Sequence, residues 1–284
     1  MVNLSGHANR ATLQADRKWG IWLFATTETP MRGRRVRLSL ARRLMADAMH
    51  FGKKTPLAVV RRAVKIGSVL EARKAAATRV SLGAIMVKAY SLTADAFPEM
   101  RQVYLKYPLP HFYEYPESVA SVTIERVVEG EHVVLGRLIR NPSALPLAEI
   151  TRILKHANEA PLDEIKEFSM ALKVARLPLV LRRALWWLGL NIGRKRANFL
   201  GTFGMSAMPL RDFEGVYAPT SWTTFFVYSF GLLDRDDSLV VGFGFDHRVI
   251  DAAQSGRILA KLEAVLADAI VNELKGERGV IQSS

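Results

Sequence analysis

Cysteine is absent from the 284 residues of the chain. Without thiols the protein can form no disulfide, no thiolate-bound zinc site and no iron–sulfur cluster, and it has no cysteine nucleophile of its own. The composition fits a reducing compartment, but exported bacterial proteins can lack cysteine as well. The absence therefore excludes several kinds of chemistry and leaves the compartment open.

Long apolar runs are absent too. Residues 1–16 are polar and contain no segment typical of a signal peptide. The longest apolar stretches, 177–181 and 184–190, are separated by Arg182 and Arg183 and are far shorter than the ~20 residues that span a bilayer. We therefore expect a cytoplasmic protein, either soluble or bound peripherally to the inner face of the membrane.

Acidic residues are scarce relative to basic ones: 27 Asp and Glu stand against 40 Lys and Arg, a formal net charge of +13. In residues 32–54 Asp47 is the only acid among eight Lys and Arg, and residues 168–211 contain no acid at all. Neither zone has zinc-ligand spacing or an RNA-binding signature, so nucleic acid is an unlikely partner. Three explanations stay open: a solvated basic face, a surface for an anionic cofactor, and a surface for acidic lipid headgroups.

What is present is a globular composition, with 49% hydrophobic and 24% charged residues, enough to build a core. Residues 104–115, rich in Pro and Tyr, predict a loop or an edge. No internal repeat or linker divides the chain, which favours one mixed α/β domain. The apolar periodicity predicts helices at 39–49, 68–77, 81–97, 146–158 and 252–274, and strands at 57–66, 118–128, 132–139, 198–205, 223–231 and 238–245.

The familiar catalytic motifs do not fit. No two of the six histidines have metal-ligand spacing, so we expect no metal site. Gly52 and Lys53 lack the upstream glycine of a phosphate-binding loop, and no third glycine follows Gly242 and Gly244. Met208 stands where a nucleophile elbow around Ser206 would need its closing glycine, which disfavours a serine hydrolase.

The most informative segment is 243–251, where a predicted strand ends in Asp246-His247-Arg248 and Asp251 follows four residues after the histidine. The end of a strand can present a titrating side chain at the mouth of a cleft. Histidine suits general-base catalysis because its ordinary pKa is near neutral. The structural alternative is that Asp251 caps the next helix and His247 merely fills a turn.

This segment resembles the Asp-His-Arg-x-x-Asp-Gly signature of the catalytic domain of dihydrolipoyl acyltransferases, the core subunits of 2-oxo acid dehydrogenase complexes. That family shares its fold with chloramphenicol acetyltransferase. Here Ala252 replaces the final glycine, a change that is tolerated unless the backbone needs a positive φ.

Upstream segments resemble the same family in the same order. Residues 201–206 are similar to its Gly-x-Phe-Thr-x-Ser strand, with Gly204 in place of the threonine. Residues 139–141 are similar to its Val-Ile-Arg-Asn segment, and 85–99 to its central helix and exit. The resemblance extends over about residues 31–274, nearly the whole chain.

The resemblance implies an α/β chloramphenicol acetyltransferase-like mixed-sheet sandwich with flanking helices. It also implies acyl transfer between coenzyme A, as a substrate, and a thiol, hydroxyl or amine acceptor. His247 would be the general base, and Ser206 would donate a hydrogen bond to the oxyanion. Asp251 would brace the histidine loop against a basic residue, with Arg37 as a candidate.

The family's assembly implies a homotrimer whose active site lies between subunits, with the serine and the histidine from different chains. We expect an N-terminal extension over 1–30, a catalytic domain over 31–276 and a tail over 277–284. Residues 1–30 are too short for a lipoyl-bearing or subunit-binding domain, which argues against lipoyl-lysine as the acceptor. The chain is therefore expected to be a stand-alone acyltransferase.

Residues 168–197 predict a basic amphipathic helical insertion, longer than the family requires. It either packs on the core or a trimer neighbour, or lies on an anionic membrane through 177–196, with Trp186 and Trp187 at headgroup level and Arg182 and Arg183 on lipid.

Two alternatives remain for the whole protein: a non-catalytic trimeric scaffold, and a basic protein that binds membrane or nucleic acid.

Overall fold

The computed structural model describes residues 32–208, 223, 225–233 and 237–276. The chain divides into two units, Met1–Arg37 and Leu38–Ser284. Of the first unit the structure describes residues 32–37, which are exposed and form neither helix nor strand. The fold below is that of the second unit. The predicted extension over 1–30 and tail over 277–284 lie outside the described residues.

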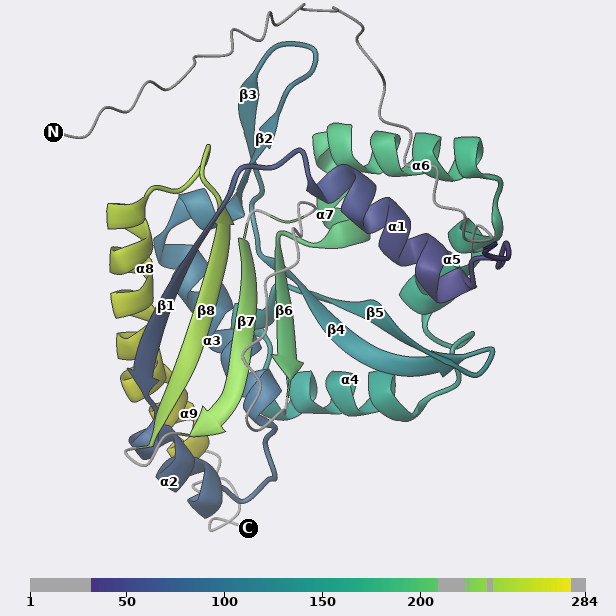
Figure 1. The fold of residues 1–284 in the computed structure, drawn as a ribbon. Helices are drawn as coiled ribbons and strands as arrows, with labels where there is room; N and C mark the ends of the chain where they lie inside the picture. The colour runs from purple at the N-terminus through teal and green to yellow at the C-terminus, as the bar shows by residue number, and fades with distance from the viewer. Residues whose placement is uncertain (1–31, 209–222, 224, 234–236, 277–284) are drawn as a thin grey trace, which may run out of the picture. The chain divides into compact units, whose positions relative to one another are not determined.

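A six-stranded mixed sheet forms the centre, in the order β1-β8-β7-β6-β4-β5 (Figure 1). Strand β6 pairs in parallel with β4 and β7, and the remaining neighbours are antiparallel. The turn between β4 and β5 has positive φ at Glu129 (52°) and Gly130 (78°), as two-residue hairpin turns require. The strands are β1 Leu57–Lys65, β4 Val119–Val128, β5 Glu131–Arg140, β6 Phe203–Met208, β7 Phe225–Leu233 and β8 Ser238–Asp246.

Helix α3 (Leu82–Ala96) lies behind the sheet in Figure 1 and contacts α4 (Leu147–Glu159) and α8 (Ala252–Val265). It begins at Ser81, whose hydroxyl accepts a hydrogen bond from the backbone N–H of Ala84 (3.1 Å). Almost every side of α3 is buried, because sheet and helices surround it. Aromatic side chains fill the space between α3 and the sheet, namely Tyr90, Phe203, Phe225, Phe243 and Phe245.

The other elements surround this core. A separate two-stranded hairpin, β2 (Gln102–Leu105) with β3 (His111–Glu114), occupies the predicted loop or edge at 104–115. The long closing helix is interrupted by a π-helical turn at Leu266–Ile270. The other helices are α1 Leu40–Gly52, α2 Gly67–Ala75, α5 Lys166–Arg176, α6 Leu179–Asn191, α7 Gly193–Leu200 and α9 Val271–Gly276, with short 3₁₀ turns at Pro98–Arg101 and Pro142–Ala144.

The predicted α/β class with a mixed sheet and flanking helices is confirmed, and the insertion is more divided than expected. Residues 168–197 belong to three helices, because Pro178 imposes an extended backbone on Leu177 and separates α5 from α6. The strand predicted at 198–205 begins only at Phe203, since α7 continues to Leu200. Gly201 ends α7 with φ 79°, and a Cβ there would lie 2.7 Å from the Val119 carbonyl oxygen.

Candidate active site

His247 is the first residue after β8, and its backbone is anchored to the neighbouring strand. Its N–H donates to the carbonyl oxygen of Pro56 (2.9 Å), directly before β1. Its ring meets that of Phe245 edge-on, with the centroids 5.8 Å apart. The residue is otherwise exposed. The fold thus fixes the position of the backbone and leaves the imidazole accessible to a substrate.

Asp246 and Arg248 flank the histidine and are joined to each other by hydrogen bonds. The Asp246 carboxylate is buried and accepts hydrogen bonds from Arg248 through its backbone N–H (3.0 Å), its Nε (2.9 Å) and its Nη2 (2.6 Å). The backbone N–H groups of Val249 and Ile250 donate to the Asp246 carbonyl oxygen. A bidentate charged pair holds this turn in one geometry.

Two residues that the sequence did not single out complete the surroundings of this turn. The guanidinium carbon of Arg248 lies 4.3 Å from the centroid of the Tyr104 ring, at cation–π distance. Arg196 of α7 is buried and interacts electrostatically with Asp246. Burial lowers the pKa of Arg196 to about 10, and the interactions with Tyr115 and Asp246 partly oppose that shift. The Pro- and Tyr-rich composition of 104–115 was the only signal that pointed to this hairpin.

Asp251 is the N-cap of α8. Its Oδ1 accepts from the backbone N–H of Gln254 (2.7 Å), and no ion pair involves it in the described part of the chain. Asp251 therefore caps the next helix, as the structural alternative predicts. Arg37 belongs to the other unit, so a pairing with Asp251 stays a prediction. Ala252 begins α8 with a helical backbone, which explains why the replaced glycine is not needed.

Ser206 lies on β6 and is half-buried, on a different part of the sheet from His247. It is in register with Tyr228 of β7, which in turn is in register with Gly242 of β8. His247 follows five residues after Gly242. At ~4.8 Å per strand and ~3.3 Å per residue, the two Cα atoms are about 19 Å apart. The two side chains therefore cannot meet within one chain.

The strand that carries Ser206 departs from the resembled motif at Gly204. A Cβ on Gly204 would lie 2.2 Å from Cδ2 of the buried Phe226 ring. A threonine at this place is therefore incompatible with the position of Phe226. The Phe226 ring on the next strand thus occupies the space that a side chain at position 204 would need.

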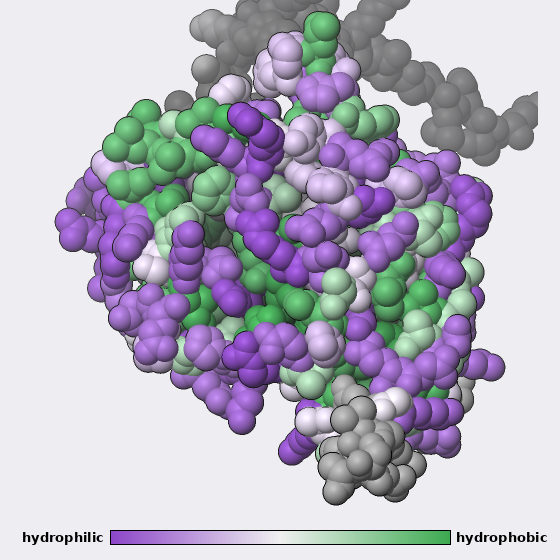
Figure 2. Space-filling view, turned by 180° about the vertical axis from the view of Figure 1, so that it is seen from behind, coloured by the Kyte–Doolittle hydropathy of each residue, from purple (hydrophilic) through white to green (hydrophobic). Residues whose placement is uncertain are grey.

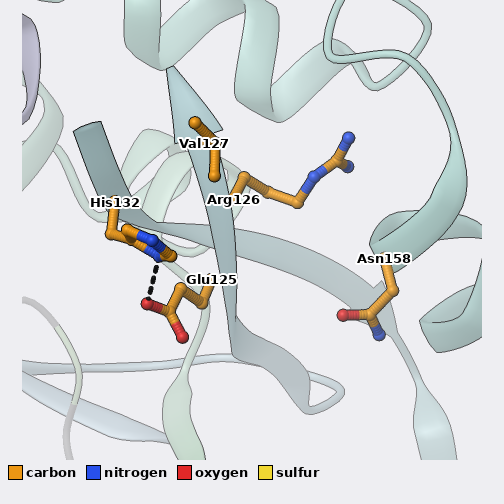
Figure 3. A pocket seen from close by; sticks show the side chains of 5 residues that line it. All are labelled: Glu125, Arg126, Val127, His132 and Asn158. Atoms are coloured by element: carbon orange, nitrogen blue, oxygen red, sulfur yellow. Dashed lines mark hydrogen bonds and ion pairs between the residues drawn. The ribbon is translucent and has the colours of Figure 1, made fainter. Parts of the chain in front are cut away.

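Away from His247, a hollow lies at the β4–β5 hairpin and α4, lined by Glu125, Arg126, Val127, His132 and Asn158 (Figure 3). Nδ1 of His132 lies 2.8 Å from Oε1 of Glu125, and both side chains are exposed. The Arg126 guanidinium donates to the carbonyl oxygens of Ala157 and Ala160, both at 2.7 Å. The polar side chains that line the hollow are thus paired with one another or with the backbone. Among the described residues, no group of three or more His, Asp and Glu has the arrangement of a metal site.

Several solved structures share the architecture described above. A dihydrolipoamide acetyltransferase of Azotobacter vinelandii superposes with a TM-score of 0.56 at 15% identity, covering 84% of this chain and 94% of that one. The catalytic core of a 2-oxoacid dehydrogenase complex from Thermoplasma acidophilum gives 0.54 at 15% identity, covering 83% and 99%. The chain has the fold of these acyltransferase cores. A probable dihydrolipoamide acetyltransferase from Listeria monocytogenes gives 0.51 at 15% identity, covering 85% and 95%.

Sequence comparison alone identifies no relative. No protein-family model matches the chain, and no curated protein matches it either. Work on the Azotobacter enzyme concerned a serine, a histidine and an asparagine in its catalytic mechanism, the asparagine four residues after the histidine. The common fold thus agrees with the resemblance seen in residues 246–251. At 15% sequence identity, the structural comparison itself shows the fold alone.

Proposed function

We propose that the protein is an acyltransferase that moves an acyl group from coenzyme A to a thiol, hydroxyl or amine acceptor. The observation that carries this proposal is the exposed imidazole of His247, held after the last strand by the Asp246–Arg248 pair in an acyltransferase-core fold. An anchored and accessible imidazole is what a general base requires.

The proposed reaction needs no covalent enzyme intermediate. A ring nitrogen of His247 takes the proton from the attacking acceptor atom, which bonds to the thioester carbonyl carbon of acyl-CoA. The resulting tetrahedral oxyanion accepts a hydrogen bond from Ser206. The C–S bond then breaks, and the proton on His247 passes to the departing coenzyme A thiolate. The acyl group ends on the acceptor, and the histidine returns to its neutral form.

The proposal requires two subunits for each site. Ser206 and His247 are about 19 Å apart in one chain, so a serine that serves His247 must come from a neighbour. A homotrimer, the assembly expected from the resemblance, would place three such sites at three equivalent interfaces. One of the similar solved structures is the cubic core of a pyruvate dehydrogenase complex, which is itself a multimeric assembly.

Asp251 is proposed as a positioning residue. Its spacing from His247 equals that of the histidine and the asparagine studied in the Azotobacter enzyme. Through its cap on Gln254 it fixes the first turn of α8, and hence the end of the histidine turn. We propose that Lys53 and Lys54, exposed just before Pro56, attract the phosphates of coenzyme A.

The direct test is a panel of acyl-CoA thioesters incubated with candidate acceptors, with release of the coenzyme A thiol and the product mass as readouts. The His247→Ala variant should lose turnover, whereas the matched control His132→Ala, in the hollow at the β4–β5 hairpin, should keep it. If no acyl-CoA in the panel supports His247-dependent thiol release, the proposed function is wrong.

A further inference from the structure

Helix α6 is attached to the molecule through its charged side. The buried Arg182 guanidinium donates to the carboxylate of Asp47 on α1 through Nε and, at 3.3 Å, through Nη2. Nε of Arg183 lies 3.8 Å from the same carboxylate, which is fully buried. A buried charge is tolerated only when it is paired, so this pair determines which side of α6 faces α1.

The neighbouring contacts agree with that orientation. The Trp186 ring stacks on Phe51 of α1, with the centroids 5.9 Å apart and the planes 11° from parallel. Leu190 is buried one turn later. Residues 182, 186 and 190 follow one another at intervals of four and so lie on one side of the helix. The opposite side of α6 consequently points away from α1.

That opposite side is apolar and exposed. Val180 is 79% exposed, and the β2–β3 hairpin adds Leu109, 75% exposed, and Tyr107, whose ring centroid lies 6.1 Å from that of Trp187. Figure 2 shows hydrophobic surface over α6 and at the tip of the hairpin. We call this surface the α6 face, made of Val180, Leu181, Leu185, Trp187 and Leu188 with Tyr107 and Leu109.

The edge of the α6 face is basic. Nζ of Lys106 lies 5.7 Å from the centroid of Tyr107, and the Arg183 side chain is 41% exposed. Arg194 and Lys195 are exposed directly after α6, and residues 168–211 contain no acidic residue. A second copy of the chain on this face would bring positive charges together, whereas anionic headgroups would neutralise them.

We propose that the α6 face binds peripherally to membranes that contain anionic lipid. The apolar residues would enter the boundary between headgroups and acyl chains, and Trp187 and Tyr107 suit that depth. No helix in the described part of the chain has the length and apolar character needed to cross a bilayer, so α6 would lie in the plane of the interface. The expectation that Arg182 itself contacts lipid is wrong, because Asp47 holds it inside. This contact goes beyond acyl transfer and does not depend on it.

The test is sedimentation of the full chain with vesicles of phosphatidylcholine, with and without phosphatidylglycerol. Binding should require phosphatidylglycerol and weaken as salt rises from about 50 to about 500 mM. Val180→Asp with Leu188→Asp should reduce binding at least about tenfold, because two charges then enter the apolar layer. The matched control is Val134→Asp on β5, a site 54% exposed and outside the α6 face, which should bind like the original protein.

A second variant separates charge from apolar contact. Lys106→Gln with Lys195→Gln leaves the apolar residues intact and should weaken binding to phosphatidylglycerol vesicles and flatten its salt dependence. Circular dichroism checks that each variant is folded. Brominated lipid should quench the tryptophan fluorescence of the original protein, and this quenching should be weaker in Trp187→Phe, which keeps the other four of the five tryptophans. The proposal is overturned if the original protein does not sediment with phosphatidylglycerol vesicles, or if the Asp variants bind like it. It is equally overturned if those variants change only the oligomeric mass, which would assign the face to a contact between copies.

Discussion

Ser206 lies on β6 and His247 directly follows β8, with β7 between these two strands. His247 is five residues beyond the β8 position level with Ser206, so one chain alone cannot bring the two side chains together. The separation of about 19 Å is well beyond the combined reach of the two side chains. If both act in one reaction, the catalytic unit is an interface, and activity depends on assembly. This relationship distinguishes the proposed mechanism from a site contained in one subunit.

Mixed assemblies should therefore recover activity from two inactive variants. When Ser206→Ala and His247→Ala chains are co-expressed in equal amounts, about a quarter of the interfaces combine an intact serine from one chain with an intact histidine from the other. Thiol release from acyl-CoA should return to about a quarter of the original rate. The control is each variant assembled alone. Recovery that never exceeds the sum of the separate variants would contradict a site shared between subunits.

The single variants should differ in severity. His247→Ala should abolish measurable turnover because no other group takes the acceptor's proton, while Ser206→Ala should reduce kcat by about two to three orders of magnitude, the usual effect of losing one oxyanion donor. Steady-state kinetics with saturating acyl-CoA separates kcat from KM. A Ser206→Ala variant with only a raised KM would assign the serine to substrate binding.

The features that follow from local sequence were predictable. Ser81 caps α3 and the Glu129-Gly130 turn joins β4 to β5, as their residue types indicate. The Asp246-His247 segment stands at the end of a strand, where the pattern placed it. Local spacing also predicted most of the helices and strands in their order along the chain. These elements depend on hydrogen bonds and periodicities that span only a few residues.

The features that depend on distant residues were not predictable. Asp47 and Arg182 are 135 residues apart, and nothing near either residue indicates that they form a pair. The same holds for Tyr104 under Arg248. The apolar runs of 177–190 predicted a helix but gave no sign of which side would be exposed. That side is set by the buried ion pair, a tertiary contact.

Removing the buried carboxylate should destabilise the protein strongly. Asp47→Ala leaves Arg182 without its counter-charge in a buried place, and the free energy of unfolding should fall by about 3–5 kcal/mol. Chemical denaturation followed by circular dichroism measures the change. The exposed pair Glu149–Arg152 is the control, since Arg152→Ala should leave the free energy of unfolding nearly unchanged.

A double replacement tests whether the pair is needed for stability or only for orientation. Asp47→Leu with Arg182→Met removes both charges, and most of the lost stability should return because no unpaired ion remains buried. Vesicle binding should persist if the stacking of Trp186 on Phe51 keeps α6 in place against α1. A double variant as unstable as Asp47→Ala would show that the ion pair itself contributes the stability.

Tyr115 should make the fold sensitive to alkaline pH. Burial raises its pKa from 10.0 to about 12, and its hydroxyl donates to the Gly193 carbonyl oxygen (3.0 Å). Between these two values the unfolded chain releases the phenolic proton and the folded chain keeps it, so the free energy of unfolding falls as pH rises from 10 to 12.

In Tyr115→Phe this part of the fall should disappear, although stability at neutral pH drops by about 1 kcal/mol with the lost hydrogen bond. Tyr90, whose pKa burial also raises, is present in both proteins, so the difference between their unfolding curves isolates Tyr115. Parallel pH profiles for the two proteins would contradict this role of the buried hydroxyl.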